Sequence, residues 1–176
     1  YILPYYNFTR SFDLDEINGM LNLYSSGSND LTNTNNLVTD ITNDLEYKSF
    51  DFISSSGFKN NFGIYFKNVN SIAKNNDLYK TSPEIEVMNL IELNSSMPLK
   101  KRNQININES LTPKISLRIN PSNDMKNHSA SNSIVNADNA FNINRLGISD
   151  SYEAGKSLTL GIDYKLDYEN EFYALE

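Results

Sequence analysis

The sequence contains no cysteine and no tryptophan, and it has a single histidine. The lack of cysteine excludes disulfide bonds, a thiol nucleophile and a cysteine-ligated metal site within the chain. One histidine excludes a histidine-rich zinc site. No run approaches the ~18 consecutive apolar residues of a transmembrane helix, and neither a glycine-rich phosphate loop nor a dinucleotide-binding fingerprint occurs. Helical membrane proteins and the common nucleotide-dependent enzymes are therefore excluded.

The charge and the residues that are abundant narrow the class further. The net charge of −7 argues against nucleic acid as a partner, because a phosphate backbone attracts basic surfaces. Tyrosine (11 residues) and phenylalanine (9 residues) favour strands, whereas asparagine, about one residue in six, favours turns and polar loops. We therefore expect an all-β chain, and 176 residues are enough for one domain.

Polar and apolar residues alternate without interruption from Ser157 to Tyr168. Successive side chains of a strand point to opposite faces, so one face of this segment is apolar and the other carries Ser, Thr, Gly, Asp and Lys. The 12 residues of this run exceed the ~5–6 of a typical strand and the ~9–11 that a tilted strand needs to cross a membrane. A transmembrane β-barrel strand, with lipid on one side and a watery lumen on the other, accommodates both faces.

Weaker alternation and turn signals predict about seven strands and the start of an eighth. The predicted strands are Tyr1–Phe12, Ile17–Ser25, Leu37–Ile53, Asn61–Val69, Glu84–Ser96, Ser110–Asn120 and Ser157–Tyr168, and Glu171–Glu176 begins the next. Because both ends of the chain read as strand, and no leader segment is recognisable, we expect an internal fragment of a longer protein.

The predicted links between these strands alternate in length. Short links are Asp13–Glu16, Ser54–Asn60 and Glu169–Asn170, longer ones are Ser26–Asn36, Lys74–Ser82 and Pro121–Ser151, and Met97–Asn108 is intermediate. Outer-membrane barrels have short periplasmic turns and longer extracellular loops. We therefore predict an antiparallel meander that forms part of a large transmembrane outer-membrane β-barrel. The alternatives are a soluble or surface-attached β-sandwich binding module and a porin or receptor barrel that imports solutes.

Only one neighbourhood combines the residue types of a nucleophilic site. His128 lies between Asn127 and Ser129, and some outer-membrane phospholipases use Ser, His and Asn. A catalytic triad, however, usually draws its members from separate segments, so a solvated histidine in a loop is the simpler interpretation.

Two pairs of carboxylates share strand faces, Glu84 with Glu86 and Asp163 with Asp167. Paired carboxylates can serve acid–base chemistry or bind Ca²⁺. On barrel strands they more simply make a charged, wet lumen. We therefore expect neither an enzyme nor a cofactor.

The segment Asp138–Tyr164 resembles the lipopolysaccharide-assembly outer-membrane protein family, LptD, also called the organic solvent tolerance protein family. That family carries the stretch Asn-Leu-Phe-x-x-Asn-Arg-Phe-x-Gly-x-Asp-Arg-x-Glu-x-Gly-x-Arg before a strand that ends Gly-Leu-x-Tyr. The matching positions are Phe141, Asn144, Arg145, Asp150, Glu153, Gly155, Gly161 and Tyr164. Lys156 stands in place of the family's Arg, and Leu146, Ile148 and Ser151 depart from its pattern.

Three further stretches resemble the same family in the right order. They are Leu3-Pro4-Tyr5-Tyr6, Ser82-Pro83-Glu84 and Leu111-Thr112-Pro113-Lys114. The resemblance implies that residues 1–176 are a middle section of a single very large barrel domain in the outer membrane of a Gram-negative bacterium. It also implies lipopolysaccharide and outer-membrane lipids as partners, together with a plug lipoprotein and the periplasmic bridge proteins of the same transport system.

Within such a barrel the period-two pattern assigns side chains to two environments. Lys114, Arg118, Asp163 and Lys165 are expected to face the lumen, and Ile115, Leu117, Leu158, Leu160 and Ile162 to face lipid. The basic side chains could bind phosphorylated sugars, although their acidic neighbours favour transit over tight capture.

The long predicted link, residues 121–151, divides into two parts. Ser122–Asn136 is rich in Asn and Ser and is expected to be mobile. Phe141–Glu153 contains apolar residues and opposite charges. We expect this second part to fold inward onto the barrel wall, with Arg145 paired to Asp150, to Glu153 or to a lumen carboxylate. The alternative is a solvated loop whose charges do not meet.

Overall fold

The computed structural model describes residues 2–33, 35–77, 79–102, 108–122, 134–145, 152–167 and 172–175. The strands are β1 (Ile2–Leu14), β2 (Gly19–Thr32), β3 (Asn36–Ser49), β4 (Phe52–Ile53), β5 (Lys59–Lys74), β6 (Glu84–Ser96), β7 (Leu99–Arg102), β8 (Asn108–Asn120), β9 (Gly155–Asp167) and β10 (Phe172–Leu175). One 3₁₀ turn, η1 (Asp15–Ile17), lies between β1 and β2. The described part of the chain has no helix that is long and apolar enough to cross a bilayer.

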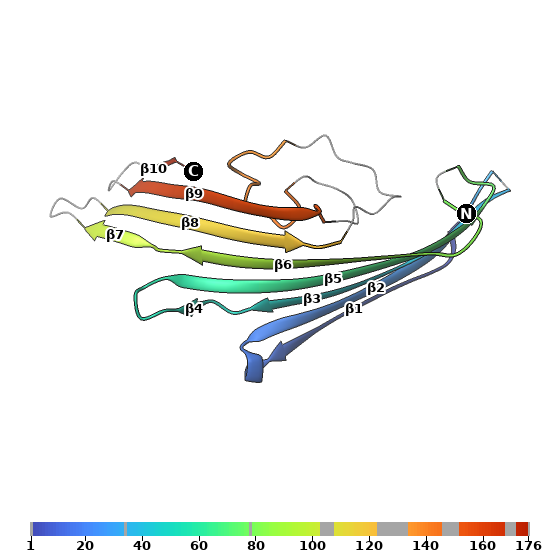
Figure 1. Cartoon of the computed structure of the whole chain (residues 1–176), viewed down its shortest axis with the longest axis horizontal. Helices are drawn as coiled ribbons and strands as arrows, with labels where there is room; N and C mark the ends of the chain where they lie inside the picture. The colour runs from blue at the N-terminus through green and yellow to red at the C-terminus, as the bar shows by residue number, and fades with distance from the viewer. Residues whose placement is uncertain are drawn as a thin grey trace.

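The described strands form one antiparallel sheet in chain order (Figure 1). Its main path is β1-β2-β3-β5-β6-β8-β9-β10, while β4 pairs with β5 and β7 pairs with β8. The sheet is open, since β1 and β10 are its two ends. The predicted meander is therefore confirmed. Two sheets packed face to face, as in a sandwich, are not what the described residues form.

Predicted strand bounds agree best where the alternation is cleanest. The strand Glu84–Ser96 matches β6 at both ends, and β8 begins two residues before the predicted Ser110. The predicted strand Leu37–Ile53 is wrong at its end, because β3 stops at Ser49 and a short β4 follows. Strand β7 was not predicted at all; it lies inside the predicted link Met97–Asn108.

The largest correction concerns the predicted long link Ser26–Asn36. In the structure β2 continues to Thr32 and pairs with β3 along its whole length, so that residues 33–35 alone connect them. At the other end of the sheet, the connection from β3 to β5, residues 50–58, is longer than residues 33–35 and contains β4. The predicted sorting of loop lengths by end of the sheet is therefore wrong for this pair of strands.

Side-chain hydrogen bonds explain why the polar part of β2 stays in the sheet. Ser25 Oγ donates to Asn43 Oδ1 at 2.7 Å, and Asn43 Nδ2 donates to Asn68 Oδ1 at 3.2 Å, which links three adjacent strands. Ser28 Oγ likewise donates to Asp40 Oδ1 at 2.6 Å. These cross-strand pairs offset the low strand propensity of Ser and Asn.

Asparagine also makes the tight connections. Asn18, Asn33 and Asn75 have φ values of 51°, 51° and 54°. This left-handed conformation is costly for most residues, but asparagine tolerates it. The three residues lie directly after η1, after β2 and after β5. Part of the high asparagine content is therefore a requirement of the turns.

One face of the curved sheet, its convex face, carries exposed and half-buried apolar side chains across neighbouring strands. This apolar band consists of Leu21, Leu23, Leu45, Tyr47, Ile64, Phe66, Ile91, Leu93, Ile115, Leu117, Leu158, Leu160 and Ile162. Leu160 is 69% exposed and Leu158 is 61% exposed. Apolar surfaces of this extent are uncommon on faces that meet only water.

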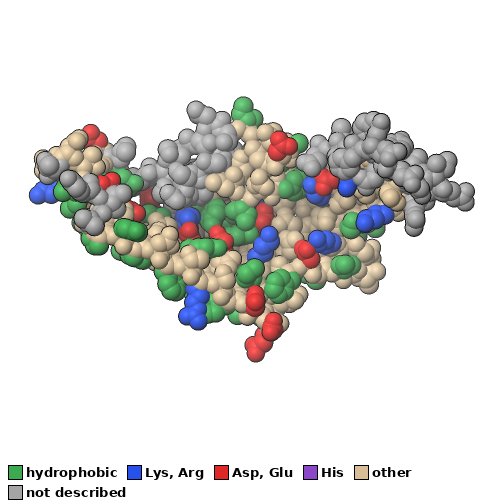
Figure 2. Space-filling view, turned by 180° about the vertical axis from the view of Figure 1, so that it is seen from behind, with side chains coloured by type: hydrophobic (Ala, Val, Ile, Leu, Met, Phe, Trp, Pro, Cys, Tyr) green, Lys and Arg blue, Asp and Glu red, His purple; other side chains and the backbone are tan. Residues whose placement is uncertain are grey.

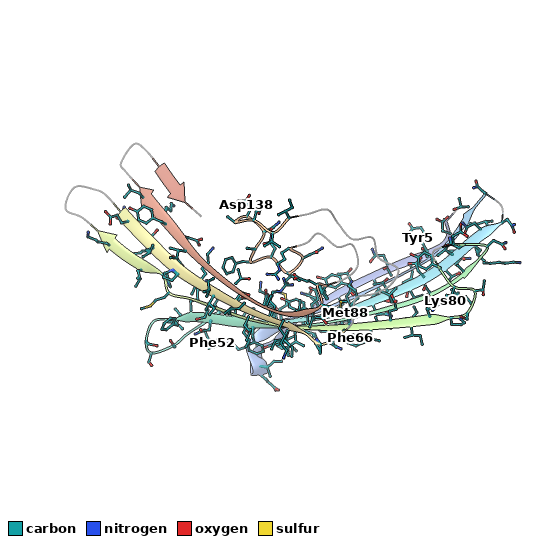
Figure 3. All side chains as sticks on the ribbon, turned by 45° about the horizontal axis from the view of Figure 1, so that its top comes forward. Tyr5, Phe52, Phe66, Lys80, Met88 and Asp138 are labelled. Atoms are coloured by element: carbon teal, nitrogen blue, oxygen red, sulfur yellow. The ribbon has the colours of Figure 1, made fainter. Side chains whose placement is uncertain are left out.

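The opposite, concave face carries the buried residues. The segment 134–145 lies over this face (Figure 3). On this face Tyr65, Val69, Met88 and Leu90 form a small core with Tyr152. Ile143 of the segment 134–145 packs against this core. Buried polar side chains share the face: Lys67, Ser71, Glu92, Ser116, Arg118 and Asn120. The core is therefore a local patch between the sheet and its covering segment.

Candidate functional site

The candidate site is the concave face together with the two stretches that lie on it, residues 134–145 and 152–154. Consecutive turns shape the first stretch. Asn136 Oδ1 accepts hydrogen bonds from the amides of Asp138 and Asn139, and the amide of Asn136 donates to Asn139 Oδ1. Such asparagine turns replace sheet pairing with local hydrogen bonds, which lets the chain double back onto the sheet.

Phe141 rests on β9 where the strand has a glycine. A β-carbon at Gly161 would lie 2.7 Å from Cε2 of the Phe141 ring. Lys114 Nζ is 5.0 Å from the centroid of the same ring and 2.5 Å from Asp163 Oδ1. The Phe141 ring thus contacts the backbone at Gly161, which has no side chain, and lies near Lys114, which is paired with Asp163.

Two buried side chains of β8 bind the backbone of the covering stretches. Arg118 donates to the carbonyl oxygens of Asn142, at 3.3 Å, and of Ile143. Asn120 Nδ2 donates to the carbonyl oxygens of Tyr152, at 3.3 Å, and Glu153, at 3.1 Å. Both donors are 3% exposed or less. They tie the backbone of both covering stretches to β8.

Arg145 and Glu153 join the two stretches by a two-bonded ion pair. The distances are 2.6 Å from Nε to Oε2 and 2.8 Å from Nη2 to Oε1, and Arg145 Nη1 also reaches Thr159 Oγ1 at 3.2 Å. This hydrogen bonding raises the pKa of Arg145 and lowers the pKa of Glu153. Of the three partners expected for Arg145, the structure shows Glu153. The described ends of Phe141–Glu153, residues 141–145 and 152–153, lie on the concave face as expected.

Tyr152 anchors the second stretch in the middle of the sheet. It is 7% exposed, and its ring centroid lies 5.9 Å from that of Tyr65. Its amide donates to Met88 Sδ at 3.0 Å, and its hydroxyl donates to Glu46 Oε1 at 3.5 Å. Burial raises the pKa of Tyr152, so the phenol remains a proton donor at neutral pH.

Oppositely charged side chains are paired across the strands below these stretches. Lys67 Nζ lies 2.7 Å from Asp44 Oδ2, and Lys67 is also 5.8 Å above the ring of Tyr152. Arg118 Nε lies 3.9 Å from Glu92 Oε1, too far for a hydrogen bond. Seen from behind, basic and acidic side chains lie next to one another over the sheet (Figure 2).

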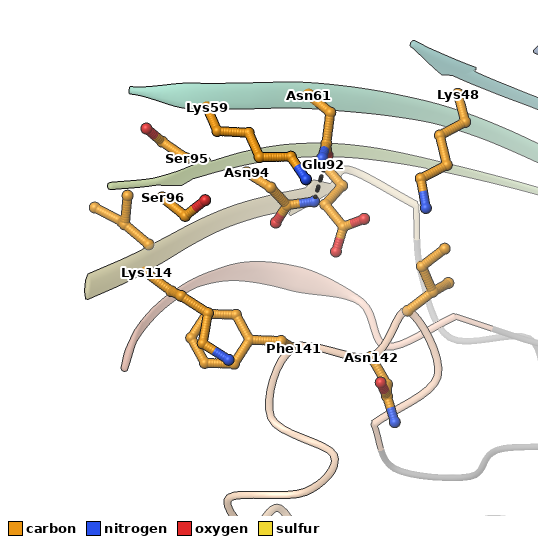
Figure 4. Close-up of a pocket in the computed structure, with 12 residues that line it drawn as sticks. Lys48, Lys59, Asn61, Glu92, Asn94, Ser95, Ser96, Lys114, Phe141 and Asn142 are labelled. Atoms are coloured by element: carbon orange, nitrogen blue, oxygen red, sulfur yellow. Dashed lines mark hydrogen bonds between the residues drawn. The ribbon is translucent and has the colours of Figure 1, made fainter. Parts of the chain in front are cut away.

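A cavity of about 540 Å³ opens between β3, β5, β6, β8 and the covering segment. We name it the lysine pocket (Figure 4). It is lined by Lys48, Lys59, Asn61, Glu92, Asn94, Ser95, Ser96, Lys114, Ile115, Phe141, Asn142 and Ile143. Asn94 Nδ2 donates to Asn61 Oδ1 at 3.1 Å across its floor. Among the described residues no group of three His, Asp or Glu side chains could hold a metal ion.

The structure brings some of the expected site residues together and separates others. Lys114 and Asp163 form one cluster with Phe141, and Arg118 lies beneath the covering segment. Lys165 shares their face but lies further along β9, opposite Ser110. Gly155 begins β9 with φ 93°, which favours glycine. Asn144 is exposed.

Several of the sequence expectations fall on residues outside the described ranges. Asp150, proposed as a partner of Arg145, is one of them, and so are His128 with its two neighbours and most of the stretch that was expected to be mobile. The residues that the sequence did not single out are Tyr65, Lys67, Met88, Glu92, Asn120 and Tyr152. Only strand register brings them together, and alternation alone does not supply register.

The sequence matches no family model and no curated protein. Membership of the LptD family therefore stays a prediction.

Proposed function

We propose that this chain is a section of the wall of an outer-membrane β-barrel that assembles lipopolysaccharide at the cell surface, as its resemblance to the LptD family implies. The observation that carries the proposal is the contrast between the two faces of the sheet. Exposed and half-buried apolar side chains form the convex apolar band, and paired charges occupy the concave face. A barrel wall needs this division between lipid and lumen.

The length of the strands supports a membrane location. Seven of the described strands have 13 to 16 residues, which is more than the ~9–11 needed to span a bilayer at a typical tilt. Hydrocarbon covering the apolar band would remove the cost of exposing it to water.

The resemblance to the family is supported by the positions of its motif residues. Arg145 and Glu153 form the ion pair, and Phe141 rests on Gly161. The four residues that match the family's motif therefore form two contacting pairs. Both pairs hold the covering stretches against the sheet.

The mechanism that follows is passage of an amphiphile. Sugars would cross along the polar concave face while acyl chains leave sideways into the bilayer. No described residue is required to perform covalent chemistry. The partners are lipopolysaccharide, outer-membrane lipids, a plug lipoprotein and periplasmic bridge proteins, all implied by the resemblance.

The test uses the full-length protein that contains this chain. After depletion of the protein, we expect surface lipopolysaccharide to fall and the permeability barrier to weaken, and the wild-type protein to restore both. The protein should fractionate with the outer membrane and require detergent for extraction. Normal surface lipopolysaccharide with lost uptake of a solute would favour an importing barrel, and release without detergent would favour a soluble binding module.

A further inference from the structure

We infer that the lysine pocket is a binding site for a phosphorylated saccharide. The inference rests on the proposed function only for the source of the ligand, a sugar of lipopolysaccharide. The pocket itself is defined by described side chains from four strands and from the covering segment. It brings three lysines of a chain with net charge −7 around one cavity.

Three lysines line the pocket, and two of them are paired with carboxylates that lie outside the lining. Lys48, Lys59 and Lys114 line it, against the single carboxylate of Glu92. Within the described part of the chain Lys48 forms no ion pair. Figure 4 shows the amines of Lys48 and Lys59 turned toward the same opening as Glu92. A phosphate group there would accept charge-assisted hydrogen bonds from these amines.

The two remaining lysines are paired in ways that a ligand can replace. Lys59 Nζ lies 2.8 Å from Asp51 Oδ2, and both side chains are about half exposed. Lys114 pairs with Asp163, and each side chain is about one-third exposed. Exposed ion pairs of this kind are weak, so a phosphate can compete for either lysine. The site therefore suits reversible binding during transit.

Glu92 distinguishes a sugar from a bare anion. The residue is 3% exposed, and its Oε1 has no hydrogen-bond partner among the described residues. The carboxylate of Glu92 repels phosphate but can accept hydrogen bonds from sugar hydroxyls. Oε1 lies 3.9 Å from Arg118 Nε, which also has no hydrogen-bond partner among the described residues, so a ligand hydroxyl between them could donate to Oε1 and accept from Nε.

The rest of the lining fits a sugar ring. Asn94 and Ser96 offer amide and hydroxyl groups on one side, and the ring of Phe141 offers an apolar surface on another. Sugars present both hydroxyl groups and apolar C–H faces. A cavity of about 540 Å³ falls within the range of small-ligand sites.

The experiment measures binding of a deacylated, phosphorylated core oligosaccharide to the purified full-length protein in detergent. The same oligosaccharide without phosphate, and inorganic phosphate alone, are the comparison probes. Wild-type protein should bind the phosphorylated oligosaccharide at least about tenfold more tightly than either. Equal binding of the dephosphorylated sugar, or equal binding of inorganic phosphate, overturns the inference.

Two charge-matched triple variants locate the site. Replacing Lys48, Lys59 and Lys114 with Gln should weaken binding about tenfold or more. Replacing Lys74, Lys100 and Lys156 with Gln removes the same charge from exposed lysines outside the lining and should leave binding within about twofold. Equal loss in both variants would mean a general charge effect and would overturn the assignment.

A single substitution protects the test against misfolding. Lys48→Gln breaks no described ion pair, so the fold should persist, and binding should fall about threefold. Unchanged binding in Lys48→Gln overturns the inference even if the triple variant does not fold. The result is independent of the proposed function: a protein that binds the probe through these lysines but does not deliver lipopolysaccharide keeps the site and loses the transport role.

Discussion

The ring of Phe141 occupies the space above Gly161 that a β-carbon would fill, 2.7 Å from the nearest ring atom. This contact joins the covering segment 134–145, which belongs to no strand, to the middle of β9. It explains why a glycine interrupts an otherwise bulky alternating strand, since a larger residue would push the covering segment away from the sheet.

Gly161→Ala should therefore loosen the covering segment without unfolding the sheet, because the ring sits on a turn and can move. We expect hydrogen exchange of a peptide spanning residues 134–145 to accelerate about fivefold or more in the full-length protein. Ser157→Ala, on the same strand and face, is the matched control and should exchange as the wild type does. Unchanged exchange in Gly161→Ala would show that the contact does not hold the segment.

The Arg145–Glu153 pair should contribute measurable coupling. Its two hydrogen bonds and partial burial place it above a typical exposed pair, so a double-mutant cycle with Arg145→Ala and Glu153→Ala should give about 1 kcal/mol. The readout is the exchange rate of the same peptide. Additive effects of the two substitutions would mean that the side chains act independently. In cells, Arg145→Ala should also weaken lipopolysaccharide delivery at normal protein level.

The pH dependence of this docking follows from the lowered pKa of Glu153. A carboxyl whose pKa is lower when docked stabilises the docked state fully above its free pKa of ~4.3, and loses that contribution as the pH falls through the docked pKa. A spin label on Asn142→Cys should therefore keep the same mobility from neutral pH to about pH 5 and become more mobile below about pH 4. In the Glu153→Gln variant the mobility should no longer change over that acid range. A wild-type transition near neutral pH would contradict this cause.

Sequence alternation predicted the sheet, its strand order and its two faces, because each depends on period two and on neighbouring strands pairing. It missed the continuation of β2 from Ser26 to Thr32, where turn-forming residues are held in the sheet by side-chain hydrogen bonds to β3, such as that from Ser28 to Asp40. Strand propensity is local, and these partners lie at least 12 residues away in sequence.

The sequence predicted only part of the candidate site, because local patterns do not tell which residues of distant strands lie side by side. The pairing of Arg145 with Glu153 was available from opposite charges in one loop. The positions of Tyr152, Met88 and Lys67 relative to one another depend on the register of distant strands. Glu92 shows the same limit, since it reads as one of several strand carboxylates until the register places it against Arg118.

Charge on the apolar band should be costly, whereas neutralising a concave side chain should not. Leu160→Arg is expected to cost ~2–4 kcal/mol of unfolding free energy if the residue lies near the bilayer midplane. Lys114→Gln should cost far less, because its ion pair with Asp163 is partly exposed. Reversible urea unfolding of the full-length protein in lipid bilayers compares the two. Equal costs would argue against opposite environments for the two faces.

The central claim is that lipid covers one face of this sheet and water the other, and a scan along β9 tests it most directly. The chain has no cysteine, so single-cysteine variants from Ser157 to Asp163 can each carry a spin label in the full-length protein in bilayers. We predict that labels at 158, 160 and 162 collide with oxygen, which concentrates in lipid, and that labels at 157, 159, 161 and 163 collide with a water-soluble nickel chelate. Collision with the nickel chelate at every position, without a period of two, would contradict the account.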